Sequence, residues 1–397
     1  MFFKIAYRSL VDRRYSALLT MLALVVSMSV LISVEHIRVQ TKESFASTVS
    51  GTDLIVGART GSLNLLLYSV FRVGAPTNNI SWSTYQDIAE SREVKWTIPL
   101  SLGDSHRGYR VLGTNQDYFN YFRYGEKHPL VFAQGEAFSS AFDVVLGATV
   151  ARHLGYDLDR EILLSHGIAS ADFNQHKGSP FTVVGILEPT GTPVDQTVHV
   201  SLQGLQAIHN SAQFSEAPDS LTAFMVALNS RMGVFTLQRK INQYRPEPIM
   251  AILPGVTLSE LWQTMSLLEQ ALRLIGALVL LAALFGLSAM LLSSVRERRH
   301  EIQLLRMAGA RPGYVFFLCE AEVLLMTVVS MLISAGLLTL ALAAGQGYLT
   351  EYFGMNISAN ILTWDSAVLA GIILSGALVM GALPALALYF RALNPER

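Results

Sequence analysis

Residues 274–314 read LIGALVLLAALFGLSAMLLSSVRERRHEIQLLRMAGARPGY, and this stretch decides the fold. Its first half, residues 274–295, is an apolar run of about 22 residues, long enough to cross a bilayer as a helix. A short basic segment follows without a break, and a second long apolar run comes next. A basic, helix-forming loop between two spans is expected on the cytoplasmic side by the positive-inside rule. Its apolar residues Ile302, Leu305 and Met307 are too few for lipid, so they suit docking onto another protein.

Apolar runs elsewhere extend this pattern to a bundle of membrane helices. We predict spans at residues 15–34, 271–295, 314–343 and 366–390. The N-terminus, the loop at 296–313 and the tail at 391–397 carry the basic flanks, whereas the predicted loop at 344–365 contains no lysine or arginine. An even number of spans places both termini on one side, which the charge asymmetry makes cytoplasmic. Residues 35–270 then lie outside the cytoplasm.

The N-terminal segment has two further interpretations. A cleaved signal peptide competes with the first span, but the apolar run leads into Glu35 and Arg38 rather than a cleavage site of small residues. Residues 1–14 separate apolar from basic side chains, which predicts an amphipathic helix along the inner leaflet. A simple basic flank is the alternative.

Composition agrees with a membrane protein diluted by a large polar segment. The chain has 397 residues, 51% of them hydrophobic and 15% charged. Its net charge of −1 gives no argument for nucleic-acid binding. Cys319 is the single cysteine, so no intrachain disulfide can form.

Apolar residues just before the second span alternate at spacings of three and four, which is typical of a heptad seam. These residues are Leu258, Leu261, Met265, Leu268, Leu272 and Ile275. With a weaker match after the first span, they predict a two-helix stalk that holds the external domain away from the membrane. The alternative is an amphipathic helix packed on that domain.

Two features of the later spans concern helix packing and charge. Ala377, Gly381 and Ala385 recur every four residues, a small-residue face that allows close helix packing. Glu320 and Glu322 begin the third span. We expect them at the interface or paired with the basic loop, and a proton path is the alternative.

The external segment predicts an α+β domain with two subdomains. Short strand-like runs at 142–146, 181–186 and 198–201 accompany a helix at 148–154. A second block at about 220–253 reads strand, helix, strand. The apolar residues 63–71 are too short to span a bilayer, so they are either a buried core segment or an exposed surface for an amphiphile or partner.

No enzyme motif emerges from the chain. It contains no G-x-x-x-x-G-K-[ST], no H-E-x-x-H, no C-x-x-C and no G-x-S-x-G. Asp104 with His106, and Asp172 with His176, have spacings that a metal could use, but such spacings arise often by chance. We therefore expect no catalytic residues, no metal and no cofactor in this chain.

Three segments together resemble the permease subunits of MacB/FtsX-type ABC systems, which include the LolC and LolE permeases. They are the lead-in IAYRSL…RRYSALLT at 5–20, the loop ERRHEIQLLRMAGA at 297–310 and the ending LPA…RALNP at 383–395. Residues 144–155 and 183–187 are similar to the MacB-like periplasmic core. Gln303 and Met307 depart from the family's usual glycine and alanine in the loop, and we expect no fused ATPase domain, unlike in MacB.

The resemblance implies a fold of four membrane helices in a bacterial inner membrane, with a large α+β periplasmic domain inserted between spans one and two. It also implies a dimer, most simply a homodimer, and a separate cytoplasmic ATPase of the LolD, FtsE or MacB kind that carries ATP and Mg. A periplasmic adaptor, lipoprotein or binding protein is a further implied partner. The ATPase would bind at Arg296, Glu297, Arg298, Arg299, Glu301, Ile302, Leu305, Arg306, Gly309 and Arg311.

The function implied is mechanotransmission. ATP hydrolysis by the partner would move the periplasmic domain through the stalk, for export or release of a substrate. The alternative is an FtsX-like signalling or scaffold protein, which activates a periplasmic partner and transports nothing.

Overall fold

The computed structural model describes residues 14–48, 50–166, 179–209, 218–297, 312–353, 358 and 360–393. These residues divide into two compact units. The membrane unit draws on Met1–Gln40, Ser266–Gly347 and Ile357–Arg397, and the α+β unit on Thr41–Met265 and Tyr348–Asn356. The amphipathic helix predicted before residue 14 lies outside the described residues.

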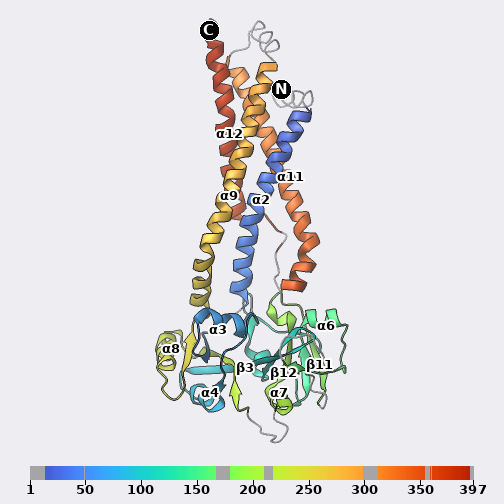
Figure 1. Cartoon of the computed structure of the whole chain (residues 1–397), viewed down its shortest axis with the longest axis vertical. Helices are drawn as coiled ribbons and strands as arrows, with labels where there is room; N and C mark the ends of the chain where they lie inside the picture. The colour runs from blue at the N-terminus through green and yellow to red at the C-terminus, as the bar shows by residue number, and fades with distance from the viewer. Residues whose placement is uncertain are drawn as a thin grey trace. The chain divides into compact units, whose positions relative to one another are not determined.

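Four long helices are, within the described part of the chain, the ones long and apolar enough to cross a membrane (Figure 1). They are α2 (Arg14–Ser47), α9 (Pro254–Glu297), α11 (Pro312–Phe353) and α12 (Trp364–Leu393). Each predicted span falls within one of them. Helix α11 extends into the predicted loop at 344–365, because it remains helical through Phe353. Alanine, leucine and glutamine at 341–346 favour helix.

The core of the membrane unit is a cluster of buried residues from all four helices. Leu24 and Met28 of α2 meet Leu287 of α9, Val323 of α11 and Ile373 of α12. Hydroxyl groups join the helices as well: Ser334 Oγ of α11 donates to the Val25 carbonyl of α2 at 2.9 Å, and Ser288 Oγ of α9 donates to the Met380 carbonyl of α12 at 2.8 Å. Such interhelical bonds satisfy polar groups where water is absent.

The α+β unit is built on a mixed sheet with helices packed against it. Its main strands are β1 (Leu54–Ala58), β3 (Val94–His106), β4 (Tyr109–Thr114), β7 (Phe132–Gly135), β8 (Asp143–Leu146), β11 (Phe181–Leu187), β12 (Thr197–Ser201), β14 (Ala223–Leu228) and β15 (Ile249–Ile252). Short strands are β2 (Ile80–Ser81), β5 (Arg123–Tyr124), β6 (His128–Pro129), β9 (Glu161–Ile162), β10 (Ser165–His166) and β13 (Ser220–Leu221). The helices are α3 (Ser62–Ser69), α4 (Trp82–Ala89), α5 (Asp117–Tyr121), α6 (Ala148–Leu154), α7 (Leu202–His209) and α8 (Val234–Asn242), with 3-10 turns η2 (Pro193–Gln196) and η3 (Arg231–Gly233).

The long strand β3 joins the two halves of the sheet, whose order is β15-β1-β14-β3-β4-β12-β8-β11-β7. Its first part pairs antiparallel with β14, from Val94 to Leu100, and its second part pairs with β4, with a register shift between Leu102 and Ser105. The β12–β4 and β11–β8 pairs are parallel. Strands β1, β12 and β14 are buried along their whole length, as expected for strands covered on both faces.

The second subdomain predicted at about 220–253 is incomplete as a unit. Its strands β14 and β15 do not pair with each other; β1 lies between them and is antiparallel to both. Two strands and one helix bury too little apolar surface to form a core alone. The apolar run at Leu54–Ala58, far away in the sequence, supplies the missing central strand.

The apolar segment 63–71 forms α3 and the turn after it. Leu65, Leu66 and Tyr68 are buried in the largest core cluster, together with Ile98 of β3. Of the two interpretations of this segment, the structure supports a buried core helix rather than an exposed surface.

Candidate functional site

Helix α9 connects the two units as one uninterrupted helix of 44 residues. At 1.5 Å per residue it is about 66 Å long, roughly twice the thickness of a bilayer's hydrocarbon core. Its first turns belong to the α+β unit, where Leu258 is buried in the main core and Leu261 packs against the same cluster. The rest of the helix runs through the membrane unit to Glu297.

The predicted stalk residues divide into two groups along this helix. Leu258 is 7% exposed, whereas Met265, Leu268 and Leu272 are 40%, 56% and 42% exposed. Ile275 is exposed as well. The first part of the seam thus packs on the α+β core, as the alternative interpretation had it, and the remainder is an uncovered apolar strip within one chain.

Helices α2 and α9 meet through charged side chains and a glycine. Arg273 of α9 donates from Nε and Nη2 to the Glu35 carboxylate of α2, each at 3.1 Å. Arg38 Nη2 lies 2.6 Å from Glu35 Oε1, and Arg38 Nη1 lies 3.7 Å from Glu269 Oε2. Next to these pairs, a Cβ on Gly276 would lie 2.9 Å from Leu31 Cδ1 of α2. The ion pairs of Arg38 and Arg273, together with the missing side chain of Gly276, thus lie on a face of α9 other than the apolar seam.

The small-residue face of α12 lies inside the membrane unit. Ala377 and Ala385 are buried, and a Cβ on Gly381 would meet Val323 Cγ2 of α11 at 2.6 Å. The α11–α12 contact therefore depends on residues with little or no side chain.

The carboxylates of α11 differ from each other in their surroundings. Glu322 is buried rather than exposed at an interface. Both carboxylate oxygens of Glu320 are buried and have no hydrogen-bond partner among the residues that the structure describes. A buried carboxylate in a membrane helix is a functional-site candidate because its charge is costly without a partner.

The predicted ATPase-coupling loop begins where the structure stops describing the chain. Arg296 and Glu297 form the last turn of α9, and α11 resumes at Pro312. The other predicted residues, Arg298, Arg299, Glu301, Ile302, Leu305, Arg306, Gly309 and Arg311, lie outside the described residues.

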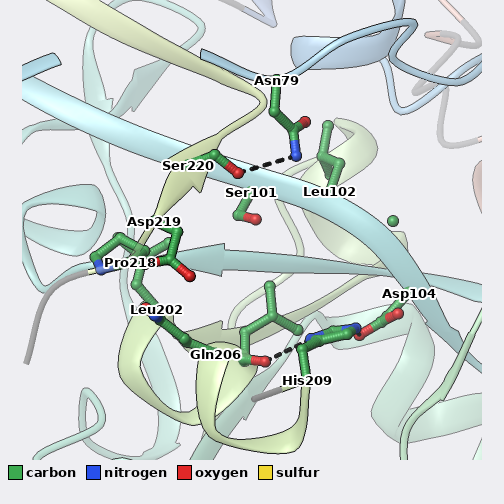
Figure 2. A pocket seen from close by; sticks show the side chains of 12 residues that line it. Asn79, Ser101, Leu102, Asp104, Leu202, Gln206, His209, Pro218, Asp219 and Ser220 are labelled. Carbon is green, nitrogen blue, oxygen red and sulfur yellow. Dashed lines mark hydrogen bonds and ion pairs between the residues drawn. The ribbon is translucent and has the colours of Figure 1, made fainter. Parts of the chain in front are cut away.

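A polar pocket of about 350 Å³ opens in the α+β unit between β3, α7 and β13 (Figure 2). The buried Asp104 of β3 and His209 of α7 meet at one end of it, with Oδ2 and Nε2 3.4 Å apart. At the other end Asn79 Nδ2 donates to Ser220 Oγ at 3.2 Å. The sequence did not predict this pocket, because its residues come from segments about a hundred positions apart.

Three histidines of the α+β unit have different environments. A hydrogen bond to Asp104 raises the pKa of His209. Burial instead lowers the pKa of His106, whose ring bonds the Leu163 carbonyl at 2.6 Å and the Tyr156 hydroxyl at 3.1 Å. Burial also lowers the pKa of His199 to about 3. Both ring nitrogens of His106 contact groups other than Asp104, and Asp104 contacts His209.

The pocket also bears on the metal-site spacings noted in the sequence. Among the described residues, no group of three or more histidine, cysteine or acidic side chains could hold a metal. Asp172 and His176 lie outside those residues. The pocket lining also includes the hydroxyl groups of Ser101 and Ser220.

Two family models match the chain. A MacB-like periplasmic core domain covers residues 17–244, and an FtsX-like permease C-terminal region covers residues 273–394. The first match includes α2 and nearly all of the α+β unit, and the second includes α11, α12 and most of α9.

Similar proteins include one curated relative and several solved domains. The pyoverdine export ATP-binding/permease protein PvdT of Pseudomonas syringae pv. tomato is 25% identical over 75% of this chain, which spans 46% of that protein's length. The periplasmic region of MacB from Actinobacillus actinomycetemcomitans is 12% identical, with 55% of this chain and 94% of that one covered and a TM-score of 0.37. The extracellular domain of the Gram-positive transporter YknZ is 13% identical, with 50% and 98% covered and a TM-score of 0.32.

Proposed function

Because the chain belongs to the MacB/FtsX-type ABC transporter permeases, we propose that it couples ATP hydrolysis on a separate cytoplasmic ATPase to movement of its α+β domain. The movement drives export or release of a substrate. In this proposal the membrane is the bacterial inner membrane, both termini are cytoplasmic and the α+β domain is periplasmic.

One observation carries this proposal: α9 is a single helix from the α+β core to Glu297. Its first turns are anchored by Leu258 in that core, and its last turn borders the basic loop where an ATPase would dock. In this proposal, a force applied at the loop is transmitted along α9 to the α+β domain.

The exposed strip Met265, Leu268, Leu272 and Ile275 supports a second copy of the chain as a partner. Apolar residues at heptad spacing pack into the matching strip of a second helix. In an isolated chain these side chains would face water or lipid headgroups, whereas a dimer would bury them against each other.

Export is favoured over signalling by the relative named for pyoverdine export. The substrate of that protein is not transferred to this chain, which spans less than half of the relative's length. An FtsX-like signalling role remains the alternative. A proteoliposome assay that follows a labelled substrate across the membrane separates export from signalling, because only export moves the substrate.

The coupling loop provides the direct test. The substitutions Glu301→Lys and Arg306→Glu should abolish stimulation of the ATPase partner by the permease while leaving membrane insertion intact. Replacement of Lys4 by glutamate, a charge reversal on the same predicted side of the membrane, is the matched control. Wild-type ATP turnover in both loop variants would contradict docking at this loop.

A further inference from the structure

A cavity of about 510 Å³ lies between α2, α9 and α12 within the membrane unit. Most of its wall is apolar, with Leu31 from α2, Leu280 and Leu284 from α9 and Ile372 from α12. Its size falls in the range of pockets that hold small ligands. An apolar cavity of this kind is unfavourable for water, because its wall offers water few hydrogen-bond partners.

The cavity is closed at one end by direct contact between α9 and α12. The Ser288 hydroxyl bonds the Met380 carbonyl there, and a Cβ on Gly376 would lie 3.6 Å from Leu284 Cδ1. From Leu284 to Arg273 the wall follows about 16 Å of helix. This depth is about half of a hydrocarbon core of ~30 Å, which is the depth of one lipid leaflet.

The open end of the cavity carries its charged residues, Glu35, Arg273 and Asp365. Glu35 is engaged by Arg38 and Arg273, so its charge is already balanced. Arg273 is nearly half exposed and can make further hydrogen bonds. Asp365 is exposed in the first turn of α12, where its charge also acts on the Arg38 guanidinium, and it is open to a further cation.

We propose that this cavity holds one acyl chain of a zwitterionic phospholipid, with the lipid phosphate at Arg273 and the lipid ammonium group at Asp365. The apolar wall matches the chain, and the two rim residues match the two opposite charges of the headgroup. An anionic phospholipid would satisfy Arg273 but leave Asp365 facing a negative headgroup. This inference does not depend on transport, because a bound membrane lipid requires no cargo.

Native mass spectrometry of the full chain in detergent tests the proposal. The probes are phosphatidylethanolamine and phosphatidylglycerol with identical acyl chains, at equal concentration. We expect the wild type to retain about one phosphatidylethanolamine per chain, with a preference of about two- to fivefold, the range for an exposed ion pair. Equal retention of the two lipids would overturn the headgroup assignment.

Variants of two glycines on α12 locate the bound chain. Gly376→Phe places a ring in the cavity and should abolish lipid retention. Gly371→Phe is the matched control, because nothing lies within 4 Å of a Cβ at that position, and it should retain lipid. Unchanged retention in Gly376→Phe would overturn the proposal.

The substitution Asp365→Asn tests the headgroup without altering the packing, since that side chain is exposed. It should retain lipid but lower the preference to about one. Two other occupants of the cavity are also outcomes of the test. If copies carrying both Ile372→Cys and Cys319→Ser form a disulfide with each other, a second chain covers the cavity and the proposal is overturned. Displacement of the lipid by an exported substrate at equal concentration would overturn it as well.

Discussion

The two units of this chain arrange apolar and polar residues in opposite ways. In the α+β unit the large apolar side chains are inside, with Phe181, Phe224 and Tyr118 fully buried. In the membrane unit Leu332, Leu340 and Ile372 point outward, while Ser330, Ser334 and Glu322 are buried. The solvent accounts for the difference: water drives apolar groups inward, whereas lipid tails are as apolar as leucine and supply no such force.

Each unit draws its stability from a different source. The α+β unit depends on burial of large side chains, so the loss of one creates a costly cavity. The membrane unit depends on close helix approach at small residues and on hydroxyl-to-carbonyl bonds, so added volume should damage it more than removed volume. Both sources of stability apply to helix α9, since its seam begins in one unit and ends in the other.

The largest expected effect is the loss of a phenylalanine from the α+β core. Phe181 of β11 is fully buried and packs edge to face on Phe142, with ring centroids 5.5 Å apart. Phe181→Ala should therefore lower the free energy of unfolding of the α+β unit by about 3–5 kcal/mol. Urea unfolding of the detergent-solubilised chain, followed by tryptophan fluorescence, measures it.

The same truncation in the membrane unit serves as the control. Phe317 of α11 is 65% exposed in the single chain, so Phe317→Ala should change the unfolding free energy by no more than about 0.5 kcal/mol. Comparable losses in both variants would break the contrast between the two units.

Acid should destabilise the α+β unit through His199. Burial lowers the pKa of this histidine to about 3, whereas it is about 6.5 in an unfolded chain. The unfolded state then binds the extra proton first, so stability falls as the pH drops below 6.5. Between pH 6.5 and 4.5 the free energy of unfolding should fall by about 2–3 kcal/mol. The variant His199→Gln should lack this part of the pH dependence. An unchanged slope in the variant would assign the acid sensitivity to other groups.

The contribution of His209 to stability should depend on pH in the opposite direction. Its pKa is raised by Asp104, so its contribution is fully present below pH 6.5 and is lost as the pH rises through the folded pKa. The comparison of His209→Gln with wild type between pH 6 and 8 measures this contribution, which should shrink toward alkaline pH.

Local pattern was enough to predict the elements that depend on neighbours in sequence. Helix α6 ends at Gly155, whose φ of 62° is the left-handed conformation that glycine favours, and the helix predicted at 148–154 is confirmed. The spans were predicted because an unbroken run of about 20 apolar residues matches the thickness of a bilayer, whereas a helix on the surface of a water-soluble domain alternates apolar and polar faces.

Contacts between distant residues could not be predicted in this way. Nothing in the run 54–58 reveals that it separates β14 from β15, because strand pairing is decided by the whole sheet. The Asp104–His209 contact and the Glu35–Arg273 contact likewise join segments far apart. Heptad spacing correctly indicated an apolar strip on α9 but could not say which surface covers it.

A smaller effect is expected where one helix approaches another through glycine. Gly381→Ala brings a Cβ within 2.6 Å of Val323 Cγ2, so it should destabilise the membrane unit by about 1–2 kcal/mol, and Val323→Ala should restore part of the loss. Gly371→Ala meets nothing within 4 Å and should be neutral or stabilising, by up to about 1 kcal/mol, because alanine favours helix. Thermal unfolding in detergent should show these opposite signs. The same sign at both glycines would mean that close packing at Gly381 is not what holds α11 and α12 together.

The smallest effect on the stability of a single chain is expected on the exposed strip of α9. Leu268 and Leu267 are adjacent and both exposed, but only Leu268 has seam spacing with Met265 and Leu272. Leu268→Asp should change the unfolding free energy by less than about 0.5 kcal/mol, because the side chain is uncovered in one chain. If the strip packs against a second copy, this variant should nevertheless lose self-association in sedimentation measurements and lower coupled ATP turnover, whereas Leu267→Asp should do neither. Equal behaviour of the two variants would mean that exposure alone, rather than the seam, accounts for the apolar strip, and the transmission of force through paired α9 helices would lose its support.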